Sequence, residues 1–280
     1  MTVNEIYQSG LKLLENNNIE NSKFEAQSLL QKAFSLDRVG FIIHKTDKAD
    51  ENCSHNFLNF IERRISGEPL QYILGEWSFM GFDFKVGRGV LIPRDDTEVV
   101  VNLCIDFLKN RADKKTVDLC SGSGAIAVAL DKISGATVTA VEIDETAFSY
   151  LETNVKENNS SVKPVMADAL KICDTFADGG LDLIVSNPPY IKSADIETLQ
   201  KEVQLEPRLA LDGGEDGCDF YREIVSRWSR KLKKGGALAF ELGEGQADTV
   251  KALMTEQGFS DFKISLDFGG VQRAIIGTLL

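Results

Sequence analysis

The sequence predicts an α/β fold with a mostly parallel sheet, preceded by a small helical domain. Three observations lead to this prediction. From Thr116 to the C-terminus, short apolar runs alternate with helical patterns, which is typical of a parallel sheet covered on both faces. Before that region, apolar and polar residues alternate as in strands. The first part of the chain instead repeats its apolar residues at helical spacing. We therefore expect three parts: residues 1–66, a β-hairpin linker at 67–92, and residues 93–280.

Length and composition fit a chain that forms one large domain and one small one. The chain has 280 residues, of which 43% are hydrophobic and 26% charged. No apolar run approaches the roughly 20 residues that span a bilayer. The first residues lack the pattern of a signal peptide, so we expect a cytoplasmic protein. A formal charge of -12 argues against direct binding to nucleic acid.

Cysteine and histidine usage excludes several kinds of site. The five cysteines are scattered, which predicts reduced thiols and no disulfide framework or zinc site. The only histidines, His44 and His55, lie outside the large C-terminal region. A serine hydrolase triad or a histidine-bound metal there is therefore not expected, and we predict no metal.

The first 66 residues contain one clear helix-start pattern. Ser22-Lys23-Phe24-Glu25 has the form of a capping box, and an apolar stripe follows it. A bundle of this size buries little core. We interpret it as a packing or partner-recognition module.

In the C-terminal region, four predicted strands end at Leu119, Val141, Met166 and Val185. Ligands of parallel sheets bind outside the carboxyl ends of the strands. The residues that follow these four positions should therefore converge on one site.

The first three strand ends predict a cofactor site. Gly122 and Gly124 permit a tight turn and close approach of a ligand. Glu142 follows Gly122 by about 20 residues, the spacing of an acid that binds ribose hydroxyls. Asp168 is a candidate for contact with an adenine amino group. At this point a dinucleotide remains possible, because residues 122–127 also fit the G-x-G-x-x-A form.

The residues after the fourth strand, Asn187-Pro188-Pro189-Tyr190, decide whether the cofactor is a dinucleotide. The Asn187 side chain and the Pro188 carbonyl offer two acceptors at a fixed separation, which matches the two hydrogens of an amino group. Tyr190 can pack on a planar acceptor. A nicotinamide site does not need this set of residues. Transfer of a methyl group from S-adenosylmethionine to a planar nitrogen does need it, and positioning of that nitrogen would supply most of the catalysis.

These motifs resemble the class I S-adenosylmethionine-dependent methyltransferases, which have a Rossmann-like fold. More narrowly, the chain resembles the protein-(glutamine-N5) methyltransferases that modify peptide chain release factors. The resemblance covers nearly the whole sequence, through Gly67–Ile73, Leu91–Arg94 with Thr97-Glu98, the glycine loop, Asn187–Ile191, Glu206-Pro207 with Ala210-Leu211, and Gly213–Gly217.

The resemblance implies that the substrate is the glutamine of the Gly-Gly-Gln loop in class 1 release factors, docked by the helical domain. Asn187 and Pro188 would hold the glutamine amide, with Pro189 and Tyr190 beside it. The cofactor S-adenosylmethionine, converted to S-adenosylhomocysteine, would contact Asp118, Cys120, Ser121, Gly122, Ser123, Gly124, Glu142, Asp168, Ala169 and Asn187. We expect a monomer with no membrane partner.

The chain departs from the family pattern at two positions. Asp95 replaces a proline after Ile-Pro-Arg, and Glu142 replaces the commoner aspartate. Ala169 stands where some relatives have a large aromatic residue, so we do not expect stacking on adenine there.

Four alternatives to this function remain. They are glutamine methylation of a ribosomal protein, adenine-N6 methylation of nucleic acid, an NAD-dependent oxidoreductase, and a binding protein without activity.

Overall fold

A computed structural model describes residues 1–280 and divides the chain into two compact units. The first, which we call the helical unit, comprises Met1–Glu76 and Gln200–Leu205. The second, the catalytic unit, comprises Trp77–Leu199 and Glu206–Leu280. The division at Glu76 lies inside the range that we expected as a linker, and the sequence pattern did not indicate that Gln200–Leu205 belongs with the N-terminal helices. None of the helices combines the length and the apolar character that a bilayer crossing requires.

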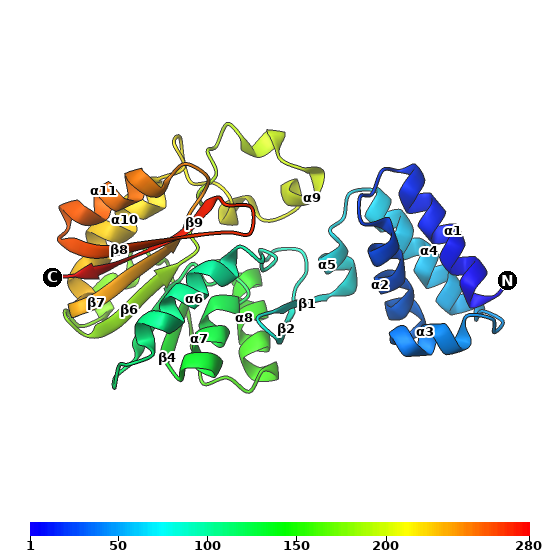
Figure 1. Cartoon of the computed structure of the whole chain (residues 1–280), viewed down its shortest axis with the longest axis horizontal. Helices are drawn as coiled ribbons and strands as arrows, with labels where there is room; N and C mark the ends of the chain where they lie inside the picture. Colours follow the sequence, from blue (N-terminus) through cyan, green and yellow to red (C-terminus); the bar gives the residue numbers. More distant parts are fainter. The chain divides into compact units, whose positions relative to one another are not determined.

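Five N-terminal helices and one short downstream helix form the helical unit (Figure 1). They are α1 (Val3–Asn16), α2 (Ser22–Phe34), α3 (Arg38–His44), α4 (Glu51–Ile65), α5 (Leu70–Leu74) and α9 (Lys201–Gln204). The buried core includes Leu14, Leu29, Leu30, Phe57 and Ile61. A side chain at Gly10 would lie 2.4 Å from the Phe57 ring, so glycine is what lets α1 pack closely on α4.

The predicted capping box at Ser22 is wrong. Asn21 precedes α2 and makes no side-chain cap, whereas Thr2 and Glu5 form a capping box at the start of α1. Glu25 instead turns inward and accepts two hydrogen bonds from Arg64, at 2.6 and 3.3 Å. A buried guanidinium is a stronger partner for this carboxylate than a backbone N–H at a helix end.

Arg64 also joins α9 to the helical unit. Its Nη2 donates to Glu202 at 2.6 Å, and 5% of its side chain is exposed. One guanidinium therefore holds two carboxylates from distant parts of the sequence, which explains how α9 is fixed against helices that precede it by more than a hundred residues.

The catalytic unit is built on a seven-stranded sheet of order β5-β4-β3-β6-β7-β9-β8. Its strands are β3 (Lys115–Leu119), β4 (Thr137–Glu142), β5 (Lys163–Met166), β6 (Leu181–Ser186), β7 (Leu232–Glu241), β8 (Phe259–Leu266) and β9 (Gln272–Leu279). The strands from β5 to β7 pair in parallel, and β9 is antiparallel to both neighbours. The predicted α/β fold with a C-terminal antiparallel strand is confirmed. A separate hairpin, β1 (Glu76–Phe79) and β2 (Phe82–Lys85), precedes it.

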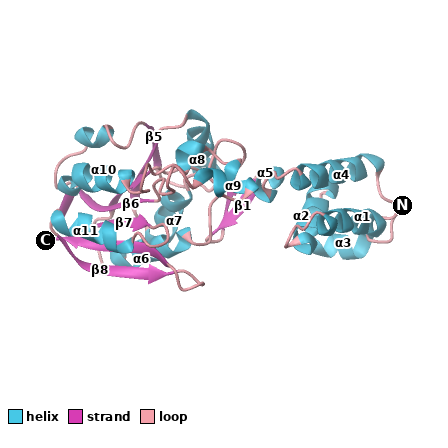
Figure 2. Ribbon diagram, turned by 90° about the horizontal axis from the view of Figure 1, so that it is seen from above, coloured by secondary structure: helices cyan, strands magenta, loops and turns pink.

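Helices cover both faces of this sheet (Figures 1 and 2). On one face lie α6 (Thr97–Leu108), α7 (Ala125–Ser134) and α8 (Glu145–Glu157), and on the other lie α10 (Asp219–Trp228) and α11 (Ala247–Glu256). Short 3-10 turns, η1 (Ile172–Thr175), η2 (Ile196–Thr198), η3 (Arg208–Ala210) and η4 (Ser229–Lys231), occupy the connections. All six residues of β6 are buried, as expected for a central strand covered on both sides.

The register brings the carboxyl ends of the central strands to one level. Leu119 in β3 is paired with Val141 in β4 and with Ser186 in β6, and Glu142 is paired with Met166 in β5. The chain leaves β3 toward β4 on one side, while β6 lies on the other side. This reversal of strand order is where ligands bind in open parallel sheets.

Candidate active site

A cavity of about 230 Å³ opens at the carboxyl ends of β3, β4, β5 and β6. The residues that follow these strands line it together with residues from two further segments. Its lining comprises Gly89, Leu91, Ile92, Pro93, Thr97, Cys120–Ser123, Ala125, Ile126, Val141–Asp144, Ala147, Ala167–Leu170, Asn187, Pro189, Pro207, Leu209, Ala210 and Phe220. The convergence that the four strand ends predicted is therefore present.

The glycine loop forms the wall above β3. Cys120 and Gly122 both have positive φ, 60° and 53°, and nothing lies within 4 Å of the position of a side chain at Gly122. The backbone there faces open space that a ligand can approach. Gly124 has φ of 84°, and a side chain on it would lie 2.5 Å from Leu151. The two glycines thus have different tasks, since Gly124 lets the loop pack against α8.

Glu142 fastens the glycine loop to the end of β4. Its Oε2 accepts the Gly122 N–H at 2.7 Å, and its Oε1 accepts the N–H groups of Ile143 and Asp144, each at 2.8 Å. The extra methylene of glutamate, compared with the commoner aspartate, gives the carboxylate a longer reach toward Gly122. One acceptor position remains for a ligand, since a carboxylate has about four.

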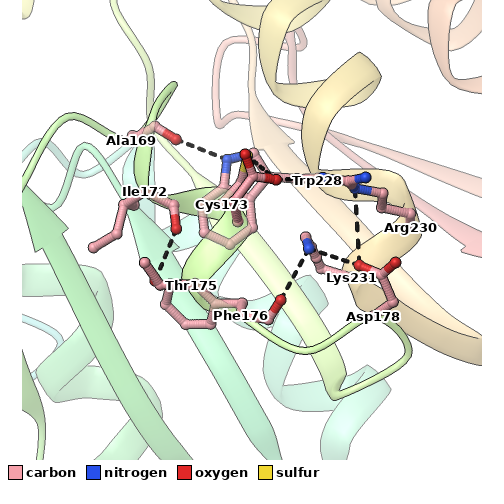
Figure 3. Close-up of polar contacts among 10 residues, drawn as sticks. Ala169, Ile172, Cys173, Thr175, Phe176, Asp178, Trp228, Arg230 and Lys231 are labelled. Atoms are coloured by element: carbon pink, nitrogen blue, oxygen red, sulfur yellow. Dashed lines mark hydrogen bonds and ion pairs between the residues drawn. The ribbon is translucent and has the colours of Figure 1, made fainter.

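Asp168 and Ala169 form the next part of the wall. Burial acts to raise the pKa of Asp168, but the Lys171 ammonium and the Leu170 N–H outweigh it and lower the pKa, so the group is ionised. The Ala169 carbonyl accepts the indole N–H of Trp228 at 2.9 Å (Figure 3). Phe220, on the same helix as Trp228, is the only aromatic side chain that lines the cavity.

The segment after Ala169 is held in place by contacts with Trp228 and Lys231. Lys231 donates to the Phe176 carbonyl at 2.9 Å and to Asp178 at 2.6 Å, and Phe176 packs on Trp228 with ring centroids 5.0 Å apart (Figure 3). Two sequence-distant side chains, Trp228 and Lys231, thereby fix the loop that follows β5. The position of Asp168 and Ala169 is set by this support.

The Asn-Pro-Pro-Tyr segment follows β6 and is held from several sides. Asn187 Nδ2 donates to Thr97 Oγ1 at 3.4 Å, and no hydrogen bond within the chain uses the Pro188 carbonyl. The Tyr190 hydroxyl donates to Glu241 Oε1 at 3.1 Å. Gln246 Nε2 donates to the Tyr190 carbonyl at 2.9 Å. Burial raises the pKa of Tyr190, so its hydroxyl stays a donor.

A further wall is closed by Glu206, which is 4% exposed. Its carboxylate accepts the Ile92 N–H at 3.0 Å and pairs with the Arg94 guanidinium. Pro207 follows directly and lines the cavity. Two segments more than a hundred residues apart in the sequence are joined by this one carboxylate.

Nine residues expected at the site line the cavity: Cys120, Ser121, Gly122, Ser123, Glu142, Asp168, Ala169, Asn187 and Pro189. Asp118, Gly124, Pro188 and Tyr190 are not among the lining residues. Sequence reasoning missed Thr97, Phe220, Leu209 and Gln246 as functional candidates. The Leu91–Arg94 and Glu206-Pro207 motifs were the signals for the two segments that close the cavity.

Asp118 has an unusual environment. Both carboxylate oxygens are buried without a hydrogen-bond partner, and burial raises the pKa of Asp118 to about 8. The Glu142 carboxylate contributes to this rise. The Ser121 hydroxyl donates to the backbone carbonyl of Asp118, at 2.9 Å, and leaves its carboxylate unpaired. A carboxyl group held in this way below a ligand loop is typical of functional sites.

The charges around the cavity favour a cationic ligand. Glu142, Asp144 and Asp168 line it, whereas no lysine, arginine or histidine does. A positively charged sulfonium fits this acidic lining.

Comparisons with known proteins identify the family. Residues 5–75 match the PrmC N-terminal domain, and residues 94–215 match the methyltransferase small domain. A release factor glutamine methyltransferase of Geobacter sulfurreducens is 41% identical over 263 residues, 93% of this chain and 91% of the relative. The chain belongs to the release factor glutamine methyltransferase family. A member from Clostridium acetobutylicum is 32% identical over 99% of this chain and 98% of its own length.

Solved structures show the same fold at lower identity. A methyltransferase from Pyrococcus furiosus is 22% identical, with a TM-score of 0.53, over 72% of this chain and 90% of its own. The catalytic domain of human Mettl16, in complex with an RNA hairpin, is 15% identical, with a TM-score of 0.58, over 82% of this chain and 83% of its own. These likenesses support the Rossmann-like methyltransferase fold of the catalytic unit.

Family membership identifies S-adenosylmethionine as the cofactor, and the cavity fits it. The acidic lining suits its sulfonium charge, Gly122 leaves open space for close approach, and Glu142 keeps an acceptor position. When bound, the cofactor supplies a methyl carbon attached to a positively charged sulfur.

Proposed function

We propose that this chain transfers a methyl group from S-adenosylmethionine to the side-chain amide nitrogen of the glutamine in the Gly-Gly-Gln motif of class 1 peptide chain release factors. The main support is a pair of acceptors at the end of β6. The Asn187 side chain lies at the cavity, and the neighbouring Pro188 carbonyl has no partner within the chain. The substrate is indicated by the names of two relatives, whose match to this chain covers 91% and 98% of their own length.

These two acceptors address the main chemical obstacle. An amide nitrogen is a poor nucleophile because its lone pair is delocalised. We propose that Asn187 and Pro188 each accept one N–H of the glutamine amide, which fixes the nitrogen in line with the methyl group and favours its pyramidal form. Positioning and electrostatic complementarity then lower the barrier, and no side-chain base has to act before methyl transfer.

The remaining expected residues have supporting roles in this proposal. Pro189 lines the cavity beside the acceptors, and Tyr190 fixes their position from behind through Glu241. Cys120 to Ser123, Glu142, Asp168 and Ala169 contact the cofactor. Asp118 and Gly124 act through the glycine loop, since neither lines the cavity.

We propose that the helical unit docks the release factor. Helix α3 has no buried residue, and its Val39, Ile42 and Ile43 side chains are 61%, 58% and 64% exposed. Changing these three residues to serine should raise KM for the release factor and leave cofactor affinity unchanged. An unchanged KM would contradict this docking role. We also propose that the enzyme works as a monomer in the cytoplasm.

Methyl transfer from labelled S-adenosylmethionine to purified release factor tests the activity. Label should enter the wild-type factor and not a factor whose Gly-Gly-Gln glutamine is changed to alanine. Asn187→Ala should reduce turnover by about 100- to 1,000-fold, since it removes an acceptor at the reacting nitrogen, while cofactor binding persists. Asn102→Ala, on the exposed face of α6, is the matched control. Label found only in nucleic acid or in a ribosomal protein would contradict the proposal.

A further inference from the structure

Glu241, the last residue of β7, is a buried carboxyl to which the proposed mechanism gives no direct task. It is 1% exposed. Its Oε1 accepts the Tyr190 hydroxyl at 3.1 Å, and its Oε2 is buried without a hydrogen-bond partner. An unsatisfied buried acceptor destabilises the fold, so the presence of this one requires an explanation.

Thr97 lies between Glu241 and the proposed substrate site. It is the first residue of α6, is 4% exposed, and lines the cavity. Its Oγ1 accepts the Asn187 side-chain NH2 at 3.4 Å. The same hydroxyl neighbours Glu241 and lowers the pKa of that carboxyl, and Glu241 Oε2, which has no hydrogen-bond partner in the structure, is the acceptor left for its hydrogen. A threonine hydroxyl has one hydrogen to donate and two lone pairs to accept with, so it can serve both neighbours at once.

We propose that Thr97 and Glu241 are positioning residues that orient the Asn187 side chain, with its oxygen toward the substrate amide. The inference rests on the proposed function, because it concerns how Asn187 meets the glutamine.

The orientation follows from counting donors and acceptors. An ionised Glu241 can only accept, so the Thr97 hydroxyl donates its single hydrogen to it. The lone pairs of Thr97 then face Asn187 and can only accept, which selects the NH2 group of the amide as their partner. The Asn187 oxygen is left for the cavity. In the flipped orientation the Asn187 NH2 would face the N–H groups of the substrate, and no hydrogen bond could form.

Protonation of Glu241 reverses this order. A neutral Glu241 can donate to Thr97, whose own hydrogen then goes to the Asn187 oxygen, so the amide turns its NH2 into the cavity. The groups facing Glu241 are Asp96 and Thr97 at the start of α6, Tyr190, Arg273 on β9, and Tyr221 on α10. Burial raises the pKa of Glu241 to about 7, Asp96 adds to the rise, and Thr97, Tyr190 and Arg273 oppose it. Turnover should therefore increase with pH through about pH 7.

Substitutions at Thr97 separate the hydroxyl from the bulk of the side chain. Thr97→Val keeps the shape but cannot bridge Asn187 and Glu241, and kcat for methylation of release factor should fall about 100-fold. Thr97→Ser keeps the hydroxyl and should retain wild-type kcat within about three-fold. The affinity for S-adenosylmethionine, measured by titration, should stay unchanged in both. Thr255→Val, on the exposed face of α11, is the matched control.

Glu241→Gln tests the other end of the series of contacts from Asn187 through Thr97 to Glu241, which we call the relay. Glutamine can donate its NH2 to Thr97, which frees the hydroxyl to turn toward the Asn187 oxygen. We expect a loss of kcat similar to that of Thr97→Val and a pH profile without the rise near pH 7. Glu256→Gln, an exposed residue at the end of α11, should keep both.

The outcomes distinguish this inference from the proposed function. If the wild-type enzyme methylates release factor while Thr97→Val and Glu241→Gln keep its kcat and pH profile, the relay is overturned and the proposed function stands. Equal losses in Thr97→Ser and Thr97→Val would also overturn it, because the hydroxyl would then not be the acting group. If wild-type enzyme leaves release factor unlabelled, the proposed function fails and the relay fails with it. Thermal unfolding followed by circular dichroism identifies any variant that loses its fold.

Discussion

The helical unit pairs its buried carboxyl groups with arginine, whereas the catalytic unit pairs some, such as Glu206 with Arg94, and leaves Asp118 and Glu241 unpaired. In the helical unit, Glu25 is paired with the guanidinium of Arg64, which also binds Glu202. In the catalytic unit, Asp118 and Glu241 are buried without a cation in hydrogen-bond contact. Burial raises the pKa of Asp118 to about 8 and that of Glu241 to about 7.

The difference separates a structural use of charge from a functional one. A buried ion pair fixes the position of the elements that carry it, and removing one partner leaves an uncompensated charge. An unpaired buried carboxyl weakens the fold at neutral pH, so its retention indicates a task elsewhere. In this protein Asp118 lies in β3 directly before the glycine loop, and Glu241 accepts the hydroxyl of Tyr190 in the Asn-Pro-Pro-Tyr segment. The following changes test that division, beginning with the one expected to have the largest effect.

Removing the arginine that pairs with the buried Glu25 should destabilise the helical unit strongly. Arg64→Ala leaves two carboxylates, of Glu25 and Glu202, without their partner, and we expect a loss of about 3–5 kcal/mol in the free energy of unfolding. Urea denaturation measures it. Arg63→Ala is the matched control, because Arg63 pairs with Glu68 but its side chain is 38% exposed, and it should cost about 1 kcal/mol or less. Equal costs would show that burial of the pair is not what matters.

The unpaired Asp118 should make stability depend on pH in a defined direction. Its pKa in the folded protein, about 8, lies above the ordinary value of 3.8, so the folded state binds the proton more tightly. The stability from this group is fully present below about pH 4 and is lost as pH rises to about 8, by about 1.4 kcal/mol per pH unit. Asp118→Asn removes this dependence.

Urea denaturation of wild-type and Asp118→Asn protein at about pH 6 and pH 8 measures this effect. Relative to the wild type, the variant should gain about 2 kcal/mol between the two values. Parallel pH profiles of the two proteins would mean that Asp118 is ionised in the folded state, which would remove its contrast with Glu25.

Glu142 represents a third way to hold a buried carboxylate, through backbone N–H groups. Glu142→Ala removes a ligand contact and releases Gly122, and affinity for S-adenosylmethionine should fall about ten-fold, or about 1.4 kcal/mol. Isothermal titration measures it. Glu152→Ala, on the exposed face of α8, should bind like the wild type. An unaltered titration curve for Glu142→Ala would exclude the proposed ribose contact.

The smallest effect is expected for an exposed charge network of the catalytic unit. Arg222 pairs with Asp216 and Asp219, and its side chain is 42% exposed. Arg222→Ala should change stability by no more than about 0.5 kcal/mol, because exposed pairs are screened by water and salt. A thermal melt is sufficient to measure it. A loss comparable with that of Arg64→Ala would mean that pairing alone, without burial, accounts for the stability of the helical unit.

Local patterns were sufficient for the elements and for the strand ends. The apolar run at 181–185 predicted β6 because a strand buried on both faces has no polar side. The glycine loop and Glu142 were recognisable because their spacing along the chain reflects a repeated strand–loop–helix unit. The capping box at Ser22 failed for the opposite reason, since a distant arginine competes for Glu25 and local spacing contains no information on Arg64.

The sequence by itself therefore determined the α/β fold, the site at the strand ends and the family of the protein. Tertiary structure decided what supports that site. Thr97 lies 90 residues before Asn187, Gln246 lies 56 residues after Tyr190, and Trp228 lies 59 residues after Ala169. These partners meet because α6, α10 and α11, which begins directly after Gln246, pack on the same sheet, and hydrogen bonds between them depend on distance in space. Periodicity reports which face of an element is buried, whereas the partner of a buried polar atom is settled only when the elements pack.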